Sequence, residues 1–269
     1  MKKLAAIWLM ALAAAPALVQ AQGIPLKTTS GSDFGIQISD QSYEADRDGA
    51  FVMSVVGKKI GVVGSFTQAL GNDWFWGGDA RLTTGATALN SATLGRRSGD
   101  PETTMELRLT AGTDLADGNH VLSPYSGLGY RAVFSYLKGY TNLGGASTSR
   151  SSTQVYVPLG VTHRFRVAED ARFATTLEYD YLLESMQRTH YTDIIGYTQD
   201  LRTTQRKGYG ARLNLAYETA RWSTGVFFHY WDIKESEVGT YATTTTVYSA
   251  THPRNVTREV GIQIRYRFD

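Results

Sequence analysis

The sequence of 269 residues contains no cysteine and only six prolines. Without cysteine, the chain has no disulfide scaffold, no thiolate zinc site, no cysteine nucleophile and no cysteine to carry a lipid anchor. An excess of one charge is also missing, because 27 basic residues nearly balance 25 acidic ones. Proteins that bind nucleic acid concentrate positive charge on one face, so we expect no nucleic-acid partner.

Long apolar runs are equally scarce, and the clearest one lies at the N-terminus. Two lysines precede an apolar stretch over residues 4–15, and the small residues Val19 and Ala21 suit the two positions that a signal peptidase reads. The sequence therefore predicts a cleaved signal peptide over residues 1–21. No later segment approaches the roughly 18 consecutive apolar residues of a transmembrane helix, which leaves a soluble exported protein or a β-barrel.

Glycine (27 residues) and tyrosine (16 residues) are abundant, as is typical of strands and turns. Apolar and polar residues alternate most clearly in the last strand, near the C-terminus. Because successive side chains of a strand point to opposite faces, one face of this strand is apolar and the other is polar. We expect the apolar face to act as the C-terminal signal that the barrel-assembly machinery recognises. This face consists of Val260, Ile262, Ile264, Tyr266 and Phe268.

The same alternation recurs along the chain in segments of about ten residues, with charged residues opposite the apolar ones. Short turns and long polar stretches separate these segments, which is the signature of an outer-membrane β-barrel. We predict an all-β fold: a closed antiparallel transmembrane β-barrel of ten strands, with short periplasmic turns and long extracellular loops. The long loops are predicted at 86–101, 139–152, 188–206 and 236–255. The strands are predicted at 33–44, 53–69, 74–86, 102–115, 121–138, 153–167, 172–188, 207–219, 221–235 and 255–268.

The first hairpin is the weakest part of this pattern. Residues 44–58 alternate poorly, and without the predicted turn at 46–49 the barrel has eight strands behind a periplasmic segment. With ten strands, residues 22–32 form a periplasmic N-terminal segment and residues 33–269 form the barrel. The sheet must close in either case, because open edges leave unpaired backbone groups in hydrocarbon. We therefore expect the outer membrane of a Gram-negative bacterium as the location, with its lipids and lipopolysaccharide as partners.

Four stretches of the sequence carry a resemblance to known proteins. They are SPYSGLGYR at 123–131, TLEYDYL at 176–182, YWDIKESE at 230–237 and EVGIQIRYRF at 259–268. These stretches resemble a largely uncharacterised group of proteobacterial outer-membrane β-barrel proteins, which implies the same fold. Asp269 departs from that group, whose barrels usually end on the aromatic residue itself. By size the chain is also similar to the ten-stranded omptin proteases and the Opc-type adhesins, which implies architecture and not activity.

The interior of a ten-stranded barrel is intermediate between small barrels filled by side chains and wide porins with an aqueous channel. Neighbouring strands carry opposite charges on their polar faces, and Arg164 and Arg166 are expected to face Glu178 and Asp180. Either these charges form an ion-pair lattice that fills the lumen, or they line a narrow pathway for ions or small solutes. The predicted lumen-lining residues are Asp79, Arg81, Glu106, Arg108, Arg131, Arg164, Arg166, Glu178, Asp180, Glu184, Arg212, His229, Glu259, Arg265 and Arg267.

The sequence does not favour an enzyme. An omptin-like protease needs two aspartates near residues 84–90 and an Asp-x-His couple opposite them, but 84–90 contains no acid and the region around His190 lacks the required aspartate. The carboxylates nearest to His190 in sequence are Glu184 and Asp193, and no histidine has a serine at the spacing of a hydrolase. We also expect no metal site and no cofactor.

These features predict an integral outer-membrane protein with a small porin-like or structural role. The alternative is an adhesin or receptor that acts through its extracellular loops, among which residues 240–252 include four consecutive threonines. An outer-membrane hydrolase is a more distant third hypothesis.

Overall fold

The computed structural model describes residues 24–268, so the predicted signal peptide (1–21) and Asp269 lie outside the described residues. Within this range the chain is built almost entirely of β-strands. The single helix among the described residues is the three-residue 3₁₀ helix η1 (Tyr191–Asp193), and no helix there is long and apolar enough to cross a membrane.

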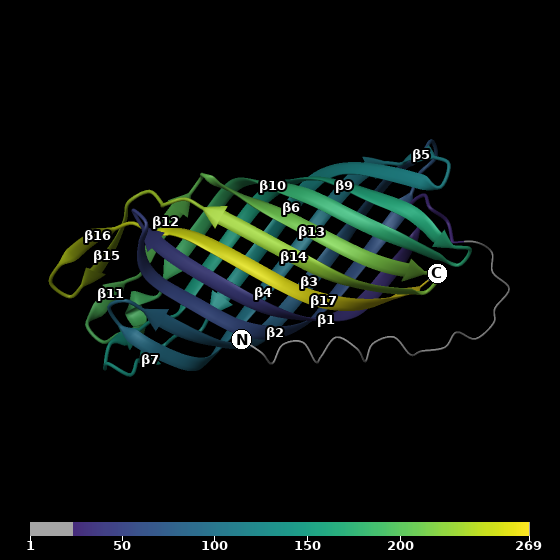
Figure 1. Ribbon diagram of the computed structural model, residues 1–269. Coiled ribbons are helices and arrows are strands. Elements are labelled where there is room, and N and C mark those ends of the chain that lie inside the picture. Colours follow the sequence, from purple (N-terminus) through teal and green to yellow (C-terminus); the bar gives the residue numbers. More distant parts are fainter. Residues whose placement is uncertain (1–23, 269) are drawn as a thin grey trace.

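Ten long strands form one closed antiparallel barrel (Figure 1). Each strand pairs with the next along the chain, and the last pairs with the first, from Ser32 opposite Phe268 to Asp46 opposite Arg254. No barrel edge is left open, as hydrocarbon requires. The ten-strand prediction is confirmed and the eight-strand alternative is wrong. The strands are β1 (Gly31–Arg47), β2 (Ala50–Ala69), β3 (Trp74–Ser91), β4 (Gly95–Thr113), β6 (His120–Ser135), β9 (Arg150–Ala168), β10 (Ala171–Thr189), β13 (Gly208–Thr219), β14 (Trp222–Ile233) and β17 (Arg254–Phe268).

The first hairpin turns at the predicted place. Arg47 pairs with Ala50, so that Asp48 and Gly49 alone connect β1 to β2. Both connecting residues have positive φ angles, 52° and 79°, which is the backbone of a type I′ turn and explains the Asp-Gly sequence. A register shift between Ala45 and Asp46 interrupts the alternation just before the turn, and this irregularity is why the pattern over 44–58 is poor.

The end of the barrel that the sequence predicts to be extracellular, called the extracellular end below, is more ordered than the loop prediction allows. Residues 86–101, predicted as a loop, are mostly strand, because β3 and β4 remain paired up to Ser91 and Gly95. A small sheet of β11, β15 and β16 projects beyond the barrel (Figure 1). Short strands thus replace much of the expected loop structure. They are β7 (Gly139–Tyr140), β8 (Ala146–Ser147), β11 (Tyr197–Gln199), β12 (Leu201–Gln205), β15 (Gly239–Thr243) and β16 (Val247–Ala250), and β5 (Leu115–Asp117) lies at the opposite end.

The two faces of the wall differ sharply in polarity. Ile36, Ile60 and Leu109 are more than half exposed on the outside, whereas Gln37 and Glu106 are buried on the inside. An outer surface of this kind is suited to lipid, and a polar interior is suited to side chains that satisfy each other. Of the predicted C-terminal signal, Val260, Ile262, Ile264 and Phe268 are exposed.

Residues 24–30 belong to the predicted periplasmic segment and lie against the short-turn end of the barrel. Ile24 N donates to the carbonyl of Glu169 (3.1 Å), and Thr28 N donates to Asp114 (2.6 Å). Lys27 pairs with Asp73 (2.6 Å). These three partners belong to different hairpins, so the segment runs across the short-turn end, which the sequence predicts to be periplasmic and which is called the periplasmic end below, before β1 begins.

Candidate functional site

The centre of the lumen is occupied by an ion cluster around Arg212. This guanidinium donates to both carboxylate oxygens of Glu106, and the distance from its Nη1 to Glu106 Oε2 is 3.0 Å. Its Nε donates to Asp180 Oδ2 at 2.7 Å. Tyr156 donates to Glu106 at 2.6 Å and accepts from Arg212 at 2.9 Å. Arg212 lies on β13 and Glu106 on β4, and three strands or more separate them in either direction around the wall. Their contact therefore crosses the lumen.

A second cluster continues around Arg81 on β3. Its guanidinium contacts both oxygens of Glu259 on β17, and its Nη1 lies 2.8 Å from Nδ1 of His229. Ser39 donates to the same Glu259 at 2.7 Å. Arg81 Nη1 also lies 3.6 Å from Glu106, which joins this cluster to the one around Arg212.

A third cluster lies around Arg108 on β4. Arg108 Nε donates to Asp79 on the neighbouring strand at 2.8 Å, and its Nη1 donates to Glu178 across the lumen at 2.5 Å. Glu178 also accepts from Tyr125 at 2.6 Å and lies 3.0 Å from Arg212. Glu106 links the first cluster to the second, and the contact of Arg212 with Glu178 links the first to the third, so all three form one network, which we call the lumen lattice.

Apolar side chains complete the filling of the lumen. Tyr156, Leu182, Trp231 and Ile233 form a buried cluster, each no more than 2% exposed. The ring of Tyr156 lies edge-on to that of Trp231, with centroids 5.1 Å apart, and Arg212 lies over the Tyr156 ring. Close packing of rings and guanidinium groups leaves the side chains of Arg81, Glu106 and Arg212 buried, so these charges depend on each other for compensation.

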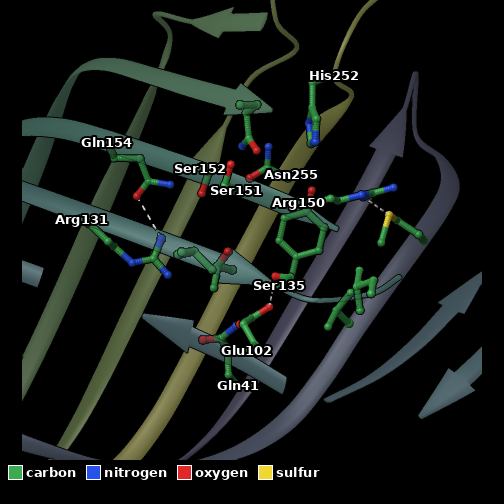
Figure 2. Close-up of a pocket in the computed structure, with 17 residues that line it drawn as sticks. Gln41, Glu102, Arg131, Ser135, Arg150, Ser151, Ser152, Gln154, His252 and Asn255 are labelled. Atoms are coloured by element: carbon green, nitrogen blue, oxygen red, sulfur yellow. Dashed lines mark hydrogen bonds between the residues drawn. The ribbon is translucent and has the colours of Figure 1, made fainter. Parts of the chain in front are cut away.

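Towards the extracellular end, a cavity of about 50 Å³ lies above the lattice (Figure 2). On the wall of this cavity, Glu102 accepts hydrogen bonds from Gln41 (2.7 Å) and from Ser135. Glu102 also forms an ion pair with Lys59 at 2.7 Å. Buried His252 also lines this cavity.

Towards the periplasmic end, the lumen widens into a vestibule of about 280 Å³. Its polar lining includes Arg164, which donates to Ser123 at 2.8 Å and lies 3.9 Å from Asp114. Arg172 pairs with Glu218 at 2.6 Å on the same wall. The core of the lattice lies between this vestibule and the cavity, and Asp79 and Arg108 of the lattice also line the vestibule.

The structure places most of the predicted lumen residues inside the barrel. The lattice contains Asp79, Arg81, Glu106, Arg108, Glu178, Asp180, Arg212, His229 and Glu259. Arg131 donates to Gln154 at 2.9 Å in the extracellular half, and Arg265 and Arg267 line the vestibule.

One of these predictions is wrong. Glu184 lies outside the lumen, because a register shift after Leu182 reverses the alternation of β10; its carboxylate pairs with Arg206 at 3.6 Å. Arg166 is opposite Arg172 in the register, at the rim of the barrel, where it donates to the carbonyl of Glu169 at 3.2 Å.

The expected pairing of Arg164 and Arg166 with Glu178 and Asp180 is also wrong. Arg164 is opposite Ala174 in the register, four residues from Glu178, and the two acids pair with Arg108 and Arg212 instead.

Sequence reasoning missed several polar residues of the lumen. Lys59 and Glu102 form a buried ion pair. They were missed because Lys59 lies in the first hairpin, where alternation is weakest, and Glu102 lies at the border of a predicted loop. Tyr156 is fully buried, and its position on the same polar face of its strand as Arg164 and Arg166 was the available signal.

Comparison with solved structures shows the fold. The outer-membrane protease OmpT from Escherichia coli matches with a TM-score of 0.61 and 14% identity, over 88% of this chain and 97% of that chain. The toluene transporter TodX from Pseudomonas putida matches with a TM-score of 0.41 and 9% identity, over 88% and 89% of the two chains. OprG from Pseudomonas aeruginosa gives 0.38 and 13%, over 91% and 99%.

No protein-family model and no curated protein matches the sequence. What the comparisons establish is therefore architecture: the chain has the fold of the outer-membrane β-barrel proteins.

Proposed function

We propose that the protein is an integral outer-membrane barrel whose lumen is closed by its own charged side chains, so that it serves as a rigid structural scaffold. The exposed apolar belt and the closed sheet support the membrane location. In this role the barrel holds an ordered extracellular end in place above the membrane.

The lumen lattice is the observation that carries this proposal. Its groups come from strands on opposite sides of the wall, and the side chains of Arg81, Glu106 and Arg212 are each less than a tenth exposed. Separating such a pair leaves a buried charge without compensation, which costs about 3–5 kcal/mol. A porin-like pathway would require several of these pairs to separate together.

Solute permeation tests the proposal directly. Liposomes that contain the refolded mature chain should not swell in isotonic arabinose. A double variant, Glu106→Ala with Arg212→Ala, removes the central cross-lumen contact and should admit the sugar if it folds. Heat-modifiable migration on gels checks folding of both proteins. Rapid swelling with the unaltered chain would contradict the closed lumen and favour the porin-like role.

A second candidate function is binding through the extracellular end. Tyr191, Tyr197, Tyr241 and Tyr248 form a stack of rings, with centroid separations of 5.3 Å, 4.3 Å and 5.2 Å along the contacts Tyr191–Tyr197, Tyr191–Tyr241 and Tyr241–Tyr248. We call these four residues the tyrosine platform. Tyrosine combines an apolar ring with a polar hydroxyl and is enriched at binding interfaces, so the platform favours an adhesin or receptor role.

Binding of the refolded chain to arrays of glycans and extracellular-matrix proteins tests this role. The double variant Tyr241→Ala with Tyr248→Ala should lose any binding of the unaltered chain, whereas Thr245→Ala on the same hairpin should retain it. Absence of binding by the unaltered chain would remove the adhesin candidate and leave the structural scaffold.

A further inference from the structure

Three polar side chains at the extracellular end are connected in the order of a serine hydrolase triad. Ser151 Oγ on β9 lies 3.3 Å from His190 Nε2, which follows the last residue of β10. The other ring nitrogen, His190 Nδ1, lies 3.5 Å from Asp200 Oδ2. A serine on one nitrogen and a buried carboxylate on the other is the arrangement that lets an imidazole remove the proton of a nucleophile.

Asp200 is held firmly in its position. Its Oδ1 accepts hydrogen bonds from the backbone N–H (3.0 Å) and the hydroxyl (2.8 Å) of Thr192, and its Oδ2 accepts one from Arg188 Nε (2.8 Å). Burial acts to raise the pKa of Asp200, but these hydrogen bonds outweigh burial and hold the pKa below its usual range. The carboxylate is therefore ionised at neutral pH and is able to stabilise a protonated His190.

By the sheet register the side chain of Ser151 points to the outside of the barrel, while the residue also borders the inner cavity (Figure 2). In the sheet register, Ser151 is opposite Phe134 on one side and Arg188 on the other, and both of these side chains are exposed. A groove of about 270 Å³ adjoins it, lined by Ser151, Met186, Arg188, Arg202 and Val238 among others.

The outward side chains of β10 change from apolar to basic towards the extracellular end of the strand. Below the groove, the outward residues Tyr181 and Leu183 belong to the apolar belt, and Met186 is the last apolar one before Arg188. Arg188 is directly opposite Arg202 in the register. Asp200 already compensates the charge of Arg188 at 2.7 Å, so an anion in the groove would compensate mainly the charge of Arg202. A ligand that fits this groove has apolar chains beside Tyr181 and Leu183 and a negative headgroup beside Arg202. An anionic amphiphile of the outer leaflet has both parts.

We propose that Ser151, His190 and Asp200 form the site of an acyl-ester hydrolase that acts on anionic amphiphiles of the outer leaflet. Ser151 Oγ attacks the ester carbonyl carbon, and its proton passes to His190 Nε2. The bond between the carbonyl carbon and the alcohol oxygen breaks, and that oxygen takes the proton from Nε2. Water then attacks the acyl-serine with transfer of its proton to Nε2; release of the carboxylic acid returns the proton to Ser151 Oγ.

The 3.3 Å and 3.5 Å separations are those of a site without substrate, since catalytic hydrogen bonds often shorten only in the substrate complex. This activity differs from the sequence expectation of no enzyme. The sequence gives Glu184 and Asp193 as the acids nearest to His190, whereas the fold brings Asp200 to it through the pairing of β10 with β12. The hydrolase does not depend on the closed lumen or on binding by the tyrosine platform.

Hydrolysis of phosphatidylglycerol with a fluorescent acyl chain, in mixed micelles with the refolded mature chain, tests this proposal. The unaltered chain should release labelled fatty acid, and a fluorophosphonate probe should label Ser151. Ser151→Ala and His190→Ala should each lower the rate by about 1,000-fold or more. Asp200→Asn should lower kcat by about 100-fold or more with little change in KM, because Asp200 is a positioning residue.

The matched control is Ser249→Ala, since Ser249 is an exposed serine on β16 and is not among the residues that line the groove. It should leave both the rate and the labelling unchanged. Heat-modifiable migration verifies folding of every variant. The proposal is overturned by a folded, unaltered chain that neither releases fatty acid nor takes up the probe, or by a Ser151→Ala protein that retains full activity.

Discussion

The replacement Glu106→Gln is the most informative test of the lumen lattice. Glu106 is 2% exposed and joins the clusters around Arg212 and Arg81. Glutamine keeps the volume and an acceptor oxygen but removes the negative charge. Arg212 retains Glu178 at 3.0 Å and Asp180 at 2.7 Å, so its own compensation is only partly lost.

The expected loss of stability follows from that partial compensation. Removal of one partner of a buried ion pair costs about 3–5 kcal/mol, and we expect the lower end, about 3 kcal/mol, because two carboxylates remain beside Arg212. Tyr156→Phe, which removes only one hydroxyl that donates to Glu106, should cost less, about 1–3 kcal/mol. We therefore expect Glu106→Gln to lose more stability than Tyr156→Phe.

Reversible urea unfolding in lipid vesicles, followed by tryptophan fluorescence, measures these changes. Glu44→Gln is the matched control, because Glu44 and Arg258 form an exposed pair at 3.1 Å, and such pairs contribute at most about 1 kcal/mol. A loss below 1 kcal/mol for Glu106→Gln, equal to that of the control, would refute the view that the lattice is dry and mutually compensated.

Two further predictions concern packing and pH. A Cβ added at Gly129 would lie 2.2 Å from Cζ of Tyr156, so Gly129→Ala should displace that ring and lower the stability by about 1–3 kcal/mol in the same unfolding assay. Burial, with a smaller contribution from Arg150, lowers the pKa of His252 from 6.5 to about 4. The folded extracellular end therefore binds fewer protons than the unfolded chain between these values, and its stability should fall by up to about 3 kcal/mol as the pH drops from above 6.5 to about 4. Limited proteolysis across this range should show the end opening at low pH, and His252→Gln should remove the pH dependence; identical profiles for both proteins would contradict the assignment.

The architecture was predictable because alternation survives in nearly every strand. Polar residues inside and apolar residues outside fix the register of each strand, since a slip by one residue would turn every side chain to the wrong face. The Asp48-Gly49 turn was also readable, because few sequences adopt two positive φ angles. These local signals were sufficient for the ten strands and for most of the lattice residues.

The remaining errors come from features that alternation does not encode. The register shift after Leu182 reverses the faces of β10 and moves Glu184 to the outside. Partners across the lumen, such as Arg212 and Glu106, depend on strand tilt and closure and not on sequence distance. The same reason explains Asp200 beside His190, because the acid lies on a segment that returns to β10 after a loop.

Thiol accessibility of single cysteines in the refolded barrel tests the closed lumen most directly, since the natural chain contains no cysteine. Thr110 lines the periplasmic vestibule, whereas Thr83 points into the lumen and is 1% exposed. With a small charged thiol reagent, Thr110→Cys should react rapidly, and Thr83→Cys should react at least about 100-fold more slowly, as expected for a site that only structural opening exposes. Equal rates at the two positions would mean that water and ions pass the lattice, and the closed-lumen account would be wrong.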